Sequence, residues 1–264
     1  METAISILPP AMDVDNTHRF SGKAEVYARF RPGYPVAILR HLESRRGFAP
    51  RSVVADVGSG TGKLTEIFLE NGNTVFAVEP NLDMRREAER LFSTDPRFHS
   101  IDATAEATSL EPASVDLIAA GQAFHWFDPD RAKIEFRRIL RPGGCVLLVW
   151  NDHDTAASAF LQDYDAFLKG YSRETVRAEG QRRPEAEVIR DFLASDYQKA
   201  DIPNSQEFDF PGLWGRYRSA SYSLPDDDPR QPEARARLEE IFGKHQAGGR
   251  VSFPMRTVMH YGSI

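Results

Sequence analysis

Apolar residues follow two alternating patterns through the first 150 residues of the chain. Short, continuous valine-rich runs are typical of strands buried on both faces of a parallel sheet, and apolar residues at a spacing of three or four predict amphipathic helices. Strands alternating with helices predict a doubly wound, mostly parallel α/β sheet. The predicted strands are 52–57, 74–79, 98–101, 114–120 and 145–150, and the predicted helices are 24–31, 35–42, 63–69, 82–92 and 129–140.

The pattern changes after residue 151. Aromatic residues at helical spacing from Phe160 to Tyr171 predict a helix that packs as core or as a cover over a site. Phe208 and Phe210 alternate with polar neighbours, as in a half-buried strand, whereas 172–187 is charged and reads as a loop. Further helices are expected at 188–193, 213–222 and 232–244, a turn at 141–144, and a final strand at 251–261.

These elements predict one domain with a seven-stranded sheet. We expect residues 1–17 to be a mobile tail, because they contain Pro9-Pro10 and no periodicity. Residues 18–264 are expected to form a single domain, with its core at 36–151 and with cover helices and the last two strands at 152–264. A separate second domain is disfavoured, since no linker breaks the chain cleanly.

Composition narrows the class of protein. The chain has 264 residues, a hydrophobic fraction of 41% and a net charge of −6, which is ordinary for a globular protein and disfavours a large nucleic-acid surface. No apolar run is long enough for a membrane span, and the N-terminus lacks the features of a signal peptide. The single cysteine, Cys145, excludes an intrachain disulfide and is typical of a reducing cytoplasm. A small-molecule or protein substrate is therefore favoured.

The stretch from Asp56 to Lys63 carries the strongest chemical signal. Glycines at Gly58, Gly60 and Gly62 follow a buried strand and lead directly into a helix. Such a turn lets a ligand approach the main chain closely. A dinucleotide fingerprint requires a third glycine at the position of Lys63, and a P-loop requires a Gly-Lys-Ser/Thr sequence that is absent here. The pattern therefore disfavours both alternatives.

The Asp-x-Gly-x-Gly-x-Gly pattern resembles the first motif of the class I S-adenosylmethionine-dependent methyltransferases, and four other segments match that family in order. Glu79 stands 21 residues after Gly58, Thr104-Ala-Glu106 follows the third strand, and Ala123 to Asp128 follows the fourth. The segment from Phe20, with Arg31-Pro, is similar to the N-terminal signature of the small-molecule branch, which includes type 11-like and trans-aconitate methyltransferase-like enzymes. The resemblance extends from about residue 18 to 151 and implies a Rossmann-like methyltransferase fold with a helical cover.

The resemblance implies that S-adenosylmethionine is the cofactor and assigns the residues that hold it. Glu79 would accept both ribose hydroxyls, Asp56 would orient the glycine turn and help hold the ammonium group, and Tyr27 and Arg31 would close the site. Many relatives have an aspartate where this chain has Thr104, so the adenine amino group is left to Glu106, to backbone carbonyls or to Asp102. The full predicted cofactor set is Tyr27, Arg31, Asp56, Gly58, Ser59, Gly60, Glu79, Pro80, Met84, Thr104, Ala105, Glu106 and Gln122.

The same resemblance places the methyl acceptor at the end of the fourth strand. His125 is the candidate catalytic base, although such a histidine is more often part of the pocket wall, and a base is needed only for a weakly nucleophilic acceptor. Asp152, His153 and Asp154 could suggest a metal, but consecutive side chains point in different directions, so no metal is expected. The predicted substrate pocket consists of Trp126, Phe127, Trp150 and Asn151.

Two other functions remain open beside methyl transfer to a small molecule, most readily to oxygen. The chain could bind S-adenosylmethionine without catalysis, or, less favourably because of Lys63, it could be an NAD-dependent oxidoreductase. A nucleic-acid adenine methyltransferase is expected to show an Asn/Asp-Pro-Pro-aromatic segment after the fourth strand, and this chain has Gln122-Ala-Phe-His125 there.

Overall fold

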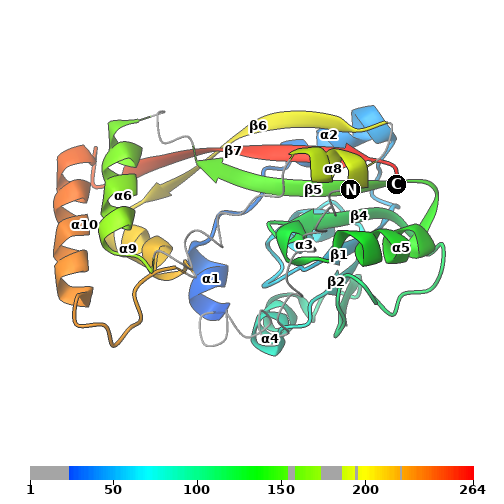
Figure 1. Cartoon of the computed structure of the whole chain (residues 1–264), viewed down its shortest axis with the longest axis horizontal. Helices are drawn as coiled ribbons and strands as arrows, with labels where there is room; N and C mark the ends of the chain where they lie inside the picture. Colours follow the sequence, from blue (N-terminus) through cyan, green and yellow to red (C-terminus); the bar gives the residue numbers. More distant parts are fainter. Residues whose placement is uncertain (1–23, 154–157, 174–185, 194–195, 221) are drawn as a thin grey trace, which may run out of the picture.

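The computed structural model describes residues 24–153, 158–173, 186–193, 196–220 and 222–264. It contains the predicted seven-stranded sheet, with strand order β3-β2-β1-β4-β5-β7-β6 (Figure 1). Strands β1 to β5 are parallel, and β7 is antiparallel to both of its neighbours. The strands are β1 (Val53–Val57), β2 (Thr74–Val78), β3 (Phe98–Ile101), β4 (Val115–Gly121), β5 (Leu140–His153), β6 (Gln198–Phe208) and β7 (Val251–Gly262).

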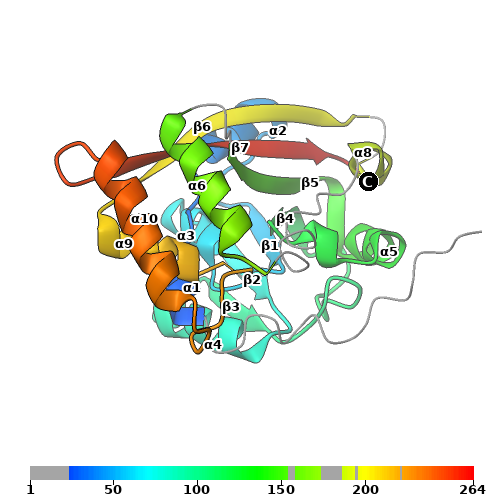
Figure 2. The same ribbon diagram turned by 60° about the vertical axis from the view of Figure 1, so that its left-hand side comes forward.

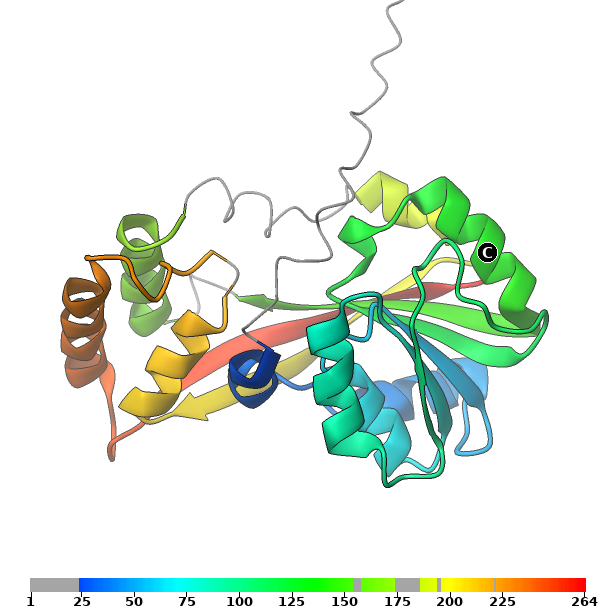
Figure 3. The same cartoon turned by 90° about the horizontal axis from the view of Figure 1, so that it is seen from below.

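Helices cover both faces of the sheet, as Figure 3 shows most clearly. On one face, α2 (Ala37–Arg46), α3 (Lys63–Glu70) and α4 (Leu82–Phe92) contribute to one hydrophobic cluster. On the other face, α5 (Pro129–Ile139) and α8 (Ala186–Phe192) contribute to a second. The valine-rich strands are buried from both sides because each face has its own layer of helices.

The cover helices form a third cluster at one end of the molecule. Helices α6 (Ala159–Gly170), α9 (Phe210–Arg218) and α10 (Gln231–His245) pack around the end of β7 that carries Phe253 and Met255. They lie together at the left of Figure 1 and come forward in Figure 2, with α1 (Ala24–Phe30) between them and the core. The aromatic stripe predicted from Phe160 to Tyr171 is the inner face of α6.

Two element boundaries differ from the sequence prediction. Strand β5 begins at Leu140, and 141–144, predicted as a turn, is a bulge within it, with Leu140 paired to Val115 and Cys145 paired to Leu117. Strand β6 is much longer than predicted, and Phe210, expected to extend it, begins α9 instead. The alternation in β6 is between exposed and half-buried positions, so its sequence carries little apolar signal.

Some predictions concern residues outside the described ranges. The tail at 1–17, the beginning of the N-terminal signature at Phe20 and most of the loop at 172–187 fall there. Within the described ranges, no helix is both long and apolar enough to cross a membrane.

Candidate functional site

A cavity of about 290 Å³ opens at the carboxyl ends of β1, β2 and β4, where ligands bind in open parallel sheets. Nearly all of the residues predicted for the site line it. They are Tyr27, Arg31, Asp56, Gly58, Ser59, Gly60, Glu79, Pro80, Met84, Thr104, Ala105, Glu106, Gln122, His125, Trp126, Phe127 and Asn151.

The glycine turn needs its glycines for two reasons. Gly58, Gly60 and Gly62 have φ angles of +67°, +58° and +85°, in the left-handed region that side chains disfavour. A Cβ on Gly62 would lie 2.4 Å from the ring of Phe92, so this glycine is a packing point between the turn and the end of α4. A Cβ at Gly60 would meet nothing within 4 Å, which leaves the main chain bare toward the cavity.

The backbone N–H groups of this turn are already used within the protein. Those of Gly58 and Ser59 donate to the carbonyl oxygen of Val78, at 2.8 and 3.2 Å, and that of Gly60 donates to Glu79 Oε2 at 2.8 Å. A phosphate-binding loop requires such groups to point at the ligand. The turn therefore disfavours a pyrophosphate and favours a ligand that contacts the main chain without an anionic group there.

Glu79 is held rigidly at the end of β2. It is 9% exposed, and its Oε1 and Oε2 each accept one backbone hydrogen bond, from Asn81 and Gly60, both at 2.8 Å. Burial raises the pKa of Glu79, while these two bonds and the nearby Arg85 lower it. A carboxylate oxygen has room for a second hydrogen bond, so both oxygens can still accept from a vicinal diol.

Asp56 is a buried carboxyl group with one unused oxygen. Its Oδ2 accepts from Thr65 Oγ1 at 2.6 Å, while Oδ1 has no hydrogen-bond partner. Burial is the main cause that raises the pKa of Asp56 to about 7. A buried, unpaired carboxylate is costly. This end of the cavity is therefore suited to a cation such as an ammonium group.

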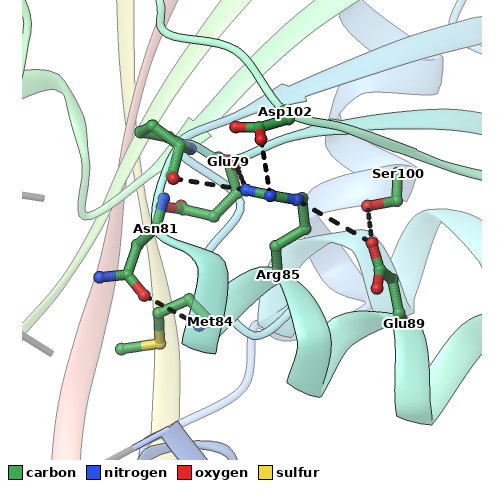
Figure 4. Close-up of polar contacts among 8 residues, drawn as sticks. Glu79, Asn81, Met84, Arg85, Glu89, Ser100 and Asp102 are labelled. Atoms are coloured by element: carbon green, nitrogen blue, oxygen red, sulfur yellow. Dashed lines mark hydrogen bonds and ion pairs between the residues drawn. The ribbon is translucent and has the colours of Figure 1, made fainter. Parts of the chain in front are cut away.

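The N-terminus of α4 forms the wall below Glu79 (Figure 4). Asn81 caps the helix by accepting from the backbone N–H of Met84 at 3.0 Å, which places the buried Met84 against the cavity. Arg85 donates to the carbonyl oxygen of Glu79 and forms an ion pair with Asp102, both at 2.8 Å or less. Asp102 is thus held by Arg85 and does not line the cavity, which removes it as a candidate for the adenine amino group.

Glu106 and backbone carbonyls are the other candidates for the adenine amino group. Glu106 lines the cavity, and its Oε1 accepts the backbone N–H of Asp128 at 2.9 Å. This bond connects the loop after β3 to the N-cap of α5. Thr104 and Ala105 complete the same loop.

The segment after β4 turns into a short 3-10 helix, Phe124–Trp126. Gln122, with a φ of +57°, begins the turn, and His125 and Trp126 face the cavity with ring centroids 4.6 Å apart. Burial lowers the pKa of His125 to about 4, and its Nδ1 is buried without a hydrogen-bond partner. His125 is therefore neutral near pH 7.

Two residues predicted for the substrate pocket, Trp150 and Asn151, have structural contacts in the protein. Trp150 does not line the cavity: it is 4% exposed and its ring packs at 5.6 Å from that of His260, on the face covered by α5 and α8. Asn151 does line it, but its side chain donates to the carbonyl oxygen of Gly33 and accepts from Asn204, so it ties the segment after α1 to the sheet.

Sequence reasoning missed several lining residues. One of these is Tyr34, and a Cβ on Gly121 would lie 2.6 Å from its hydroxyl oxygen. The Arg31-Pro32 sequence identifies this segment as part of the N-terminal signature, but it does not indicate where the ring of Tyr34 points. The other lining residues that were not predicted are Pro32, Thr61, Lys63, Leu64, Asn81, Gly121, Ala123 and Tyr222.

The chain is similar to known methyltransferases in sequence and in structure. Residues 55–148 match the family described as "Methyltransferase domain". An uncharacterised methyltransferase of Mycobacterium tuberculosis is 39% identical over 140 residues, which are 53% of this chain and 55% of that protein. One from Schizosaccharomyces pombe is 34% identical over 49% of this chain and 51% of that protein. The chain thus spans about half the length of the curated relatives it matches.

Solved structures extend the likeness to nearly the whole chain. A candidate type II methyltransferase from Anaeromyxobacter dehalogenans superposes with a TM-score of 0.64 at 25% identity, covering 89% of this chain and 98% of its own. A candidate methyltransferase from an antibiotic biosynthesis pathway of Anabaena variabilis has the same fold, with a TM-score of 0.61 at 22% identity over 90% and 100%.

Residues 55–148 carry a methyltransferase domain, similar to those of the class I S-adenosylmethionine-dependent family. In this family S-adenosylmethionine is the methyl donor. The cavity presents residues that suit that molecule, because both Asp56, with its unpaired Oδ1, and the carboxylate of Glu79 line it. The described part of the methyltransferase domain contains no group of three side chains that could hold a metal ion.

Proposed function

We propose that this chain transfers a methyl group from S-adenosylmethionine to a small-molecule acceptor, most readily to oxygen. The observation that carries the proposal is the combination of the unpaired Asp56 oxygen with the doubly anchored carboxylate of Glu79 in one cavity. The first suits the cofactor's ammonium group and the second its ribose diol. The glycine turn, whose N–H groups are used internally, supports this cofactor over NAD.

The remaining residues of the cavity are assigned by position. Gly58, Ser59 and Gly60 would lie against the methionyl part, with Gln122 nearby. Pro80 and Met84 would contact the adenine on one side. The loop Thr104-Ala-Glu106 would hold its edge, and Tyr27 and Arg31 would close the site from α1.

The chain's contribution to the reaction is alignment and exclusion of water. S-adenosylmethionine, when bound, would supply a methyl group on a sulfonium centre, for which a neutral thioether is the leaving group. Fixing the two reactants in a water-poor site can lower a barrier by about 7–11 kcal/mol. Trp126 and Phe127 would form the wall beside the acceptor, and Trp126 can also face a cation with its ring.

Cofactor binding is expected to depend on pH through Asp56. The ammonium group requires the carboxylate form, which is populated above the pKa of about 7. Affinity for S-adenosylhomocysteine should therefore rise roughly tenfold between about pH 6 and pH 8 and change little above that. Calorimetry across this range tests the expectation. Asp56→Asn should bind weakly at every pH, and a wild-type affinity that is flat with pH would contradict the assignment.

His125 is expected to contribute only modestly to catalysis. Burial keeps it neutral above about pH 4, so it can accept a proton, but a group with so low a pKa is a weak base. We expect His125→Gln to lower kcat about tenfold with unchanged cofactor affinity. In the wild type, protonation of His125 should not lower kcat until the pH falls toward 4. A 100-fold or greater loss of kcat would show that His125 is an effective general base. An unchanged kcat would show that His125 serves only as part of the pocket wall.

The proposal is tested by offering the acceptor pocket a broad set of compounds. The purified chain, S-adenosylmethionine and a metabolite extract are incubated, and products heavier by one methyl group are identified by mass spectrometry. Glu79→Ala serves as the control. Products that form only with the wild type support methyl transfer. Cofactor binding without any product would favour the non-catalytic alternative.

We infer a single domain over 18–264, with a core at 36–151 and a cover at 152–264, because β6 and β7 extend the core sheet into the cover. The acceptor is proposed to be a small molecule, without nucleic acid, membrane or metal in the reaction. The cytoplasmic location suggested by the single cysteine, which is buried, stays a prediction.

A further inference from the structure

Arg216, on the inner side of α9, is a buried charge. Its side chain is 2% exposed. Nη2 donates to Nε2 of His153 at 3.2 Å, and the guanidinium lies 5.6 Å from the centre of the Phe253 ring. Nε is buried and has no hydrogen-bond partner. A histidine nitrogen that accepts a hydrogen bond carries no proton, so neither contact brings a negative charge to Arg216.

A second guanidinium lies beside this one. Helices α1 and α9 approach so closely that a Cβ on Gly215 would lie 2.5 Å from the ring of Phe30. Arg31 follows Phe30 directly and donates from Nη2 to the carbonyl oxygen of Ser219 at the end of α9, at 3.4 Å. Its Nε is also buried without a partner. The close approach therefore brings Arg31 and Arg216 together, and the charge of Arg31 adds to burial in lowering the pKa of Arg216.

Arginine remains charged in proteins, so a buried pair of this kind requires an anion. Arg85, which is 9% exposed, has one, because it forms an ion pair with Asp102 at 2.7 Å. Among the described residues, Arg216 and Arg31 form no ion pair. The residues whose proximity opposes this lowering of the pKa of Arg216 are Tyr164, Tyr222 and Tyr27, none of which is a carboxylate.

This pair lies beside the cavity. Arg31 and Tyr222 both line the cavity, and Arg216 lies close behind them. The acids Asp56, Glu79 and Glu106 line the part assigned to the cofactor. The carboxylate of the cofactor can neutralise only one of the two guanidinium groups, so one positive charge remains for the other reactant.

We propose that the end of the cavity formed by Arg31 and Tyr222 and backed by Arg216 binds an anionic oxygen group of the methyl acceptor, a carboxylate or a phosphate. A guanidinium recognises either group through paired N–H donors, and the tyrosine hydroxyl can add a further donor. The inference rests on the proposed function, since it assumes that the cofactor occupies the acidic part of the same cavity and that the anion belongs to the methyl acceptor. The substrate class is then a small acid.

The experiment measures thermal unfolding of the chain saturated with S-adenosylhomocysteine. Sodium malonate and sodium phosphate are compared with sodium chloride at equal ionic strength. We expect malonate or phosphate to raise Tm by about 3–6 °C at tenfold its dissociation constant. The anion that gives the larger rise distinguishes carboxylate from phosphate. Arg216→Gln should lose this rise.

The matched control is Arg218→Gln, on the same helix but in an exposed ion pair with Asp226, which should keep the rise. If Arg216→Gln does not fold, Arg216→Met decides the question, because it also removes the positive charge behind Arg31 and should show less than half of the wild-type rise. Equal rises in wild type and the Arg216 variant, or none in wild type, would overturn the inference. Failure of S-adenosylhomocysteine to bind would instead overturn the proposed function. The effect of the anions on Tm can still be measured in the absence of S-adenosylhomocysteine.

Discussion

Replacing Glu79 by alanine is expected to weaken the binding of S-adenosylhomocysteine at least about 100-fold. A hydrogen bond to a charged group contributes about 1.5–3 kcal/mol, and the variant loses the acceptor for both ribose hydroxyls. It also leaves the N–H groups of Gly60 and Asn81 without their acceptor, which loosens the glycine turn and the cap of α4. Calorimetric titration of wild type and variant measures the change directly.

The control for this variant is Glu89→Ala. Glu89 lies on α4, where it accepts from Ser100 and lies 4.0 Å from Arg85 (Figure 4), and it does not line the cavity. It should leave the affinity within about twofold, as is usual for a surface substitution. If Glu79→Ala bound as tightly as Glu89→Ala, the ribose assignment would be wrong.

The second large effect is expected from Gly58→Ala. The φ angle of +67° disfavours any side chain, and the new Cβ would lie 2.6 Å from the Cβ of Ala123 and 3.4 Å from the ring of Phe127. A left-handed residue costs about 1–3 kcal/mol, and the contact must be relieved by moving the segment after β4. We expect Tm to fall by about 4 °C or more and cofactor affinity to fall more than tenfold.

Gly143→Ala separates these two causes. Gly143 has a similar φ angle of +82°, but a Cβ there would meet nothing within 4 Å, and the residue lies in the bulge of β5 away from the cavity. It should lower Tm modestly and leave cofactor affinity unchanged. Equal losses of affinity in both variants would show that backbone strain acts through overall stability and not through the turn at Gly58.

The sequence predicts the parallel strands, the final strand at 251–261 and most of the helices. Continuous apolar runs such as 74–79 can be recognised because such strands are buried on both faces, and the glycines mark the turn through their φ angles. The extent of the edge strand β6 could not be predicted, because most of its residues are polar or charged and give no apolar pattern. The strand is held instead by its pairing with β7.

The site is predictable where one short motif determines the geometry. Asp56 and Glu79 can be placed because each ends a strand at the same edge of the sheet. Trp150 was misplaced because alternate residues of β5 face opposite sides, and its ring packs against His260. Arg216 was missed because it reaches Arg31 only through the packing of α9 on α1, across 185 residues of chain that no local pattern connects.

The most direct test of the central claim is a calorimetric titration of the wild-type chain with S-adenosylmethionine and, separately, with NAD. The unpaired oxygen of Asp56, the anchored carboxylate of Glu79 and the internally bonded glycine turn predict micromolar, one-to-one binding of S-adenosylmethionine and no measurable binding of NAD. Binding of NAD alone, or of neither compound, would contradict the account.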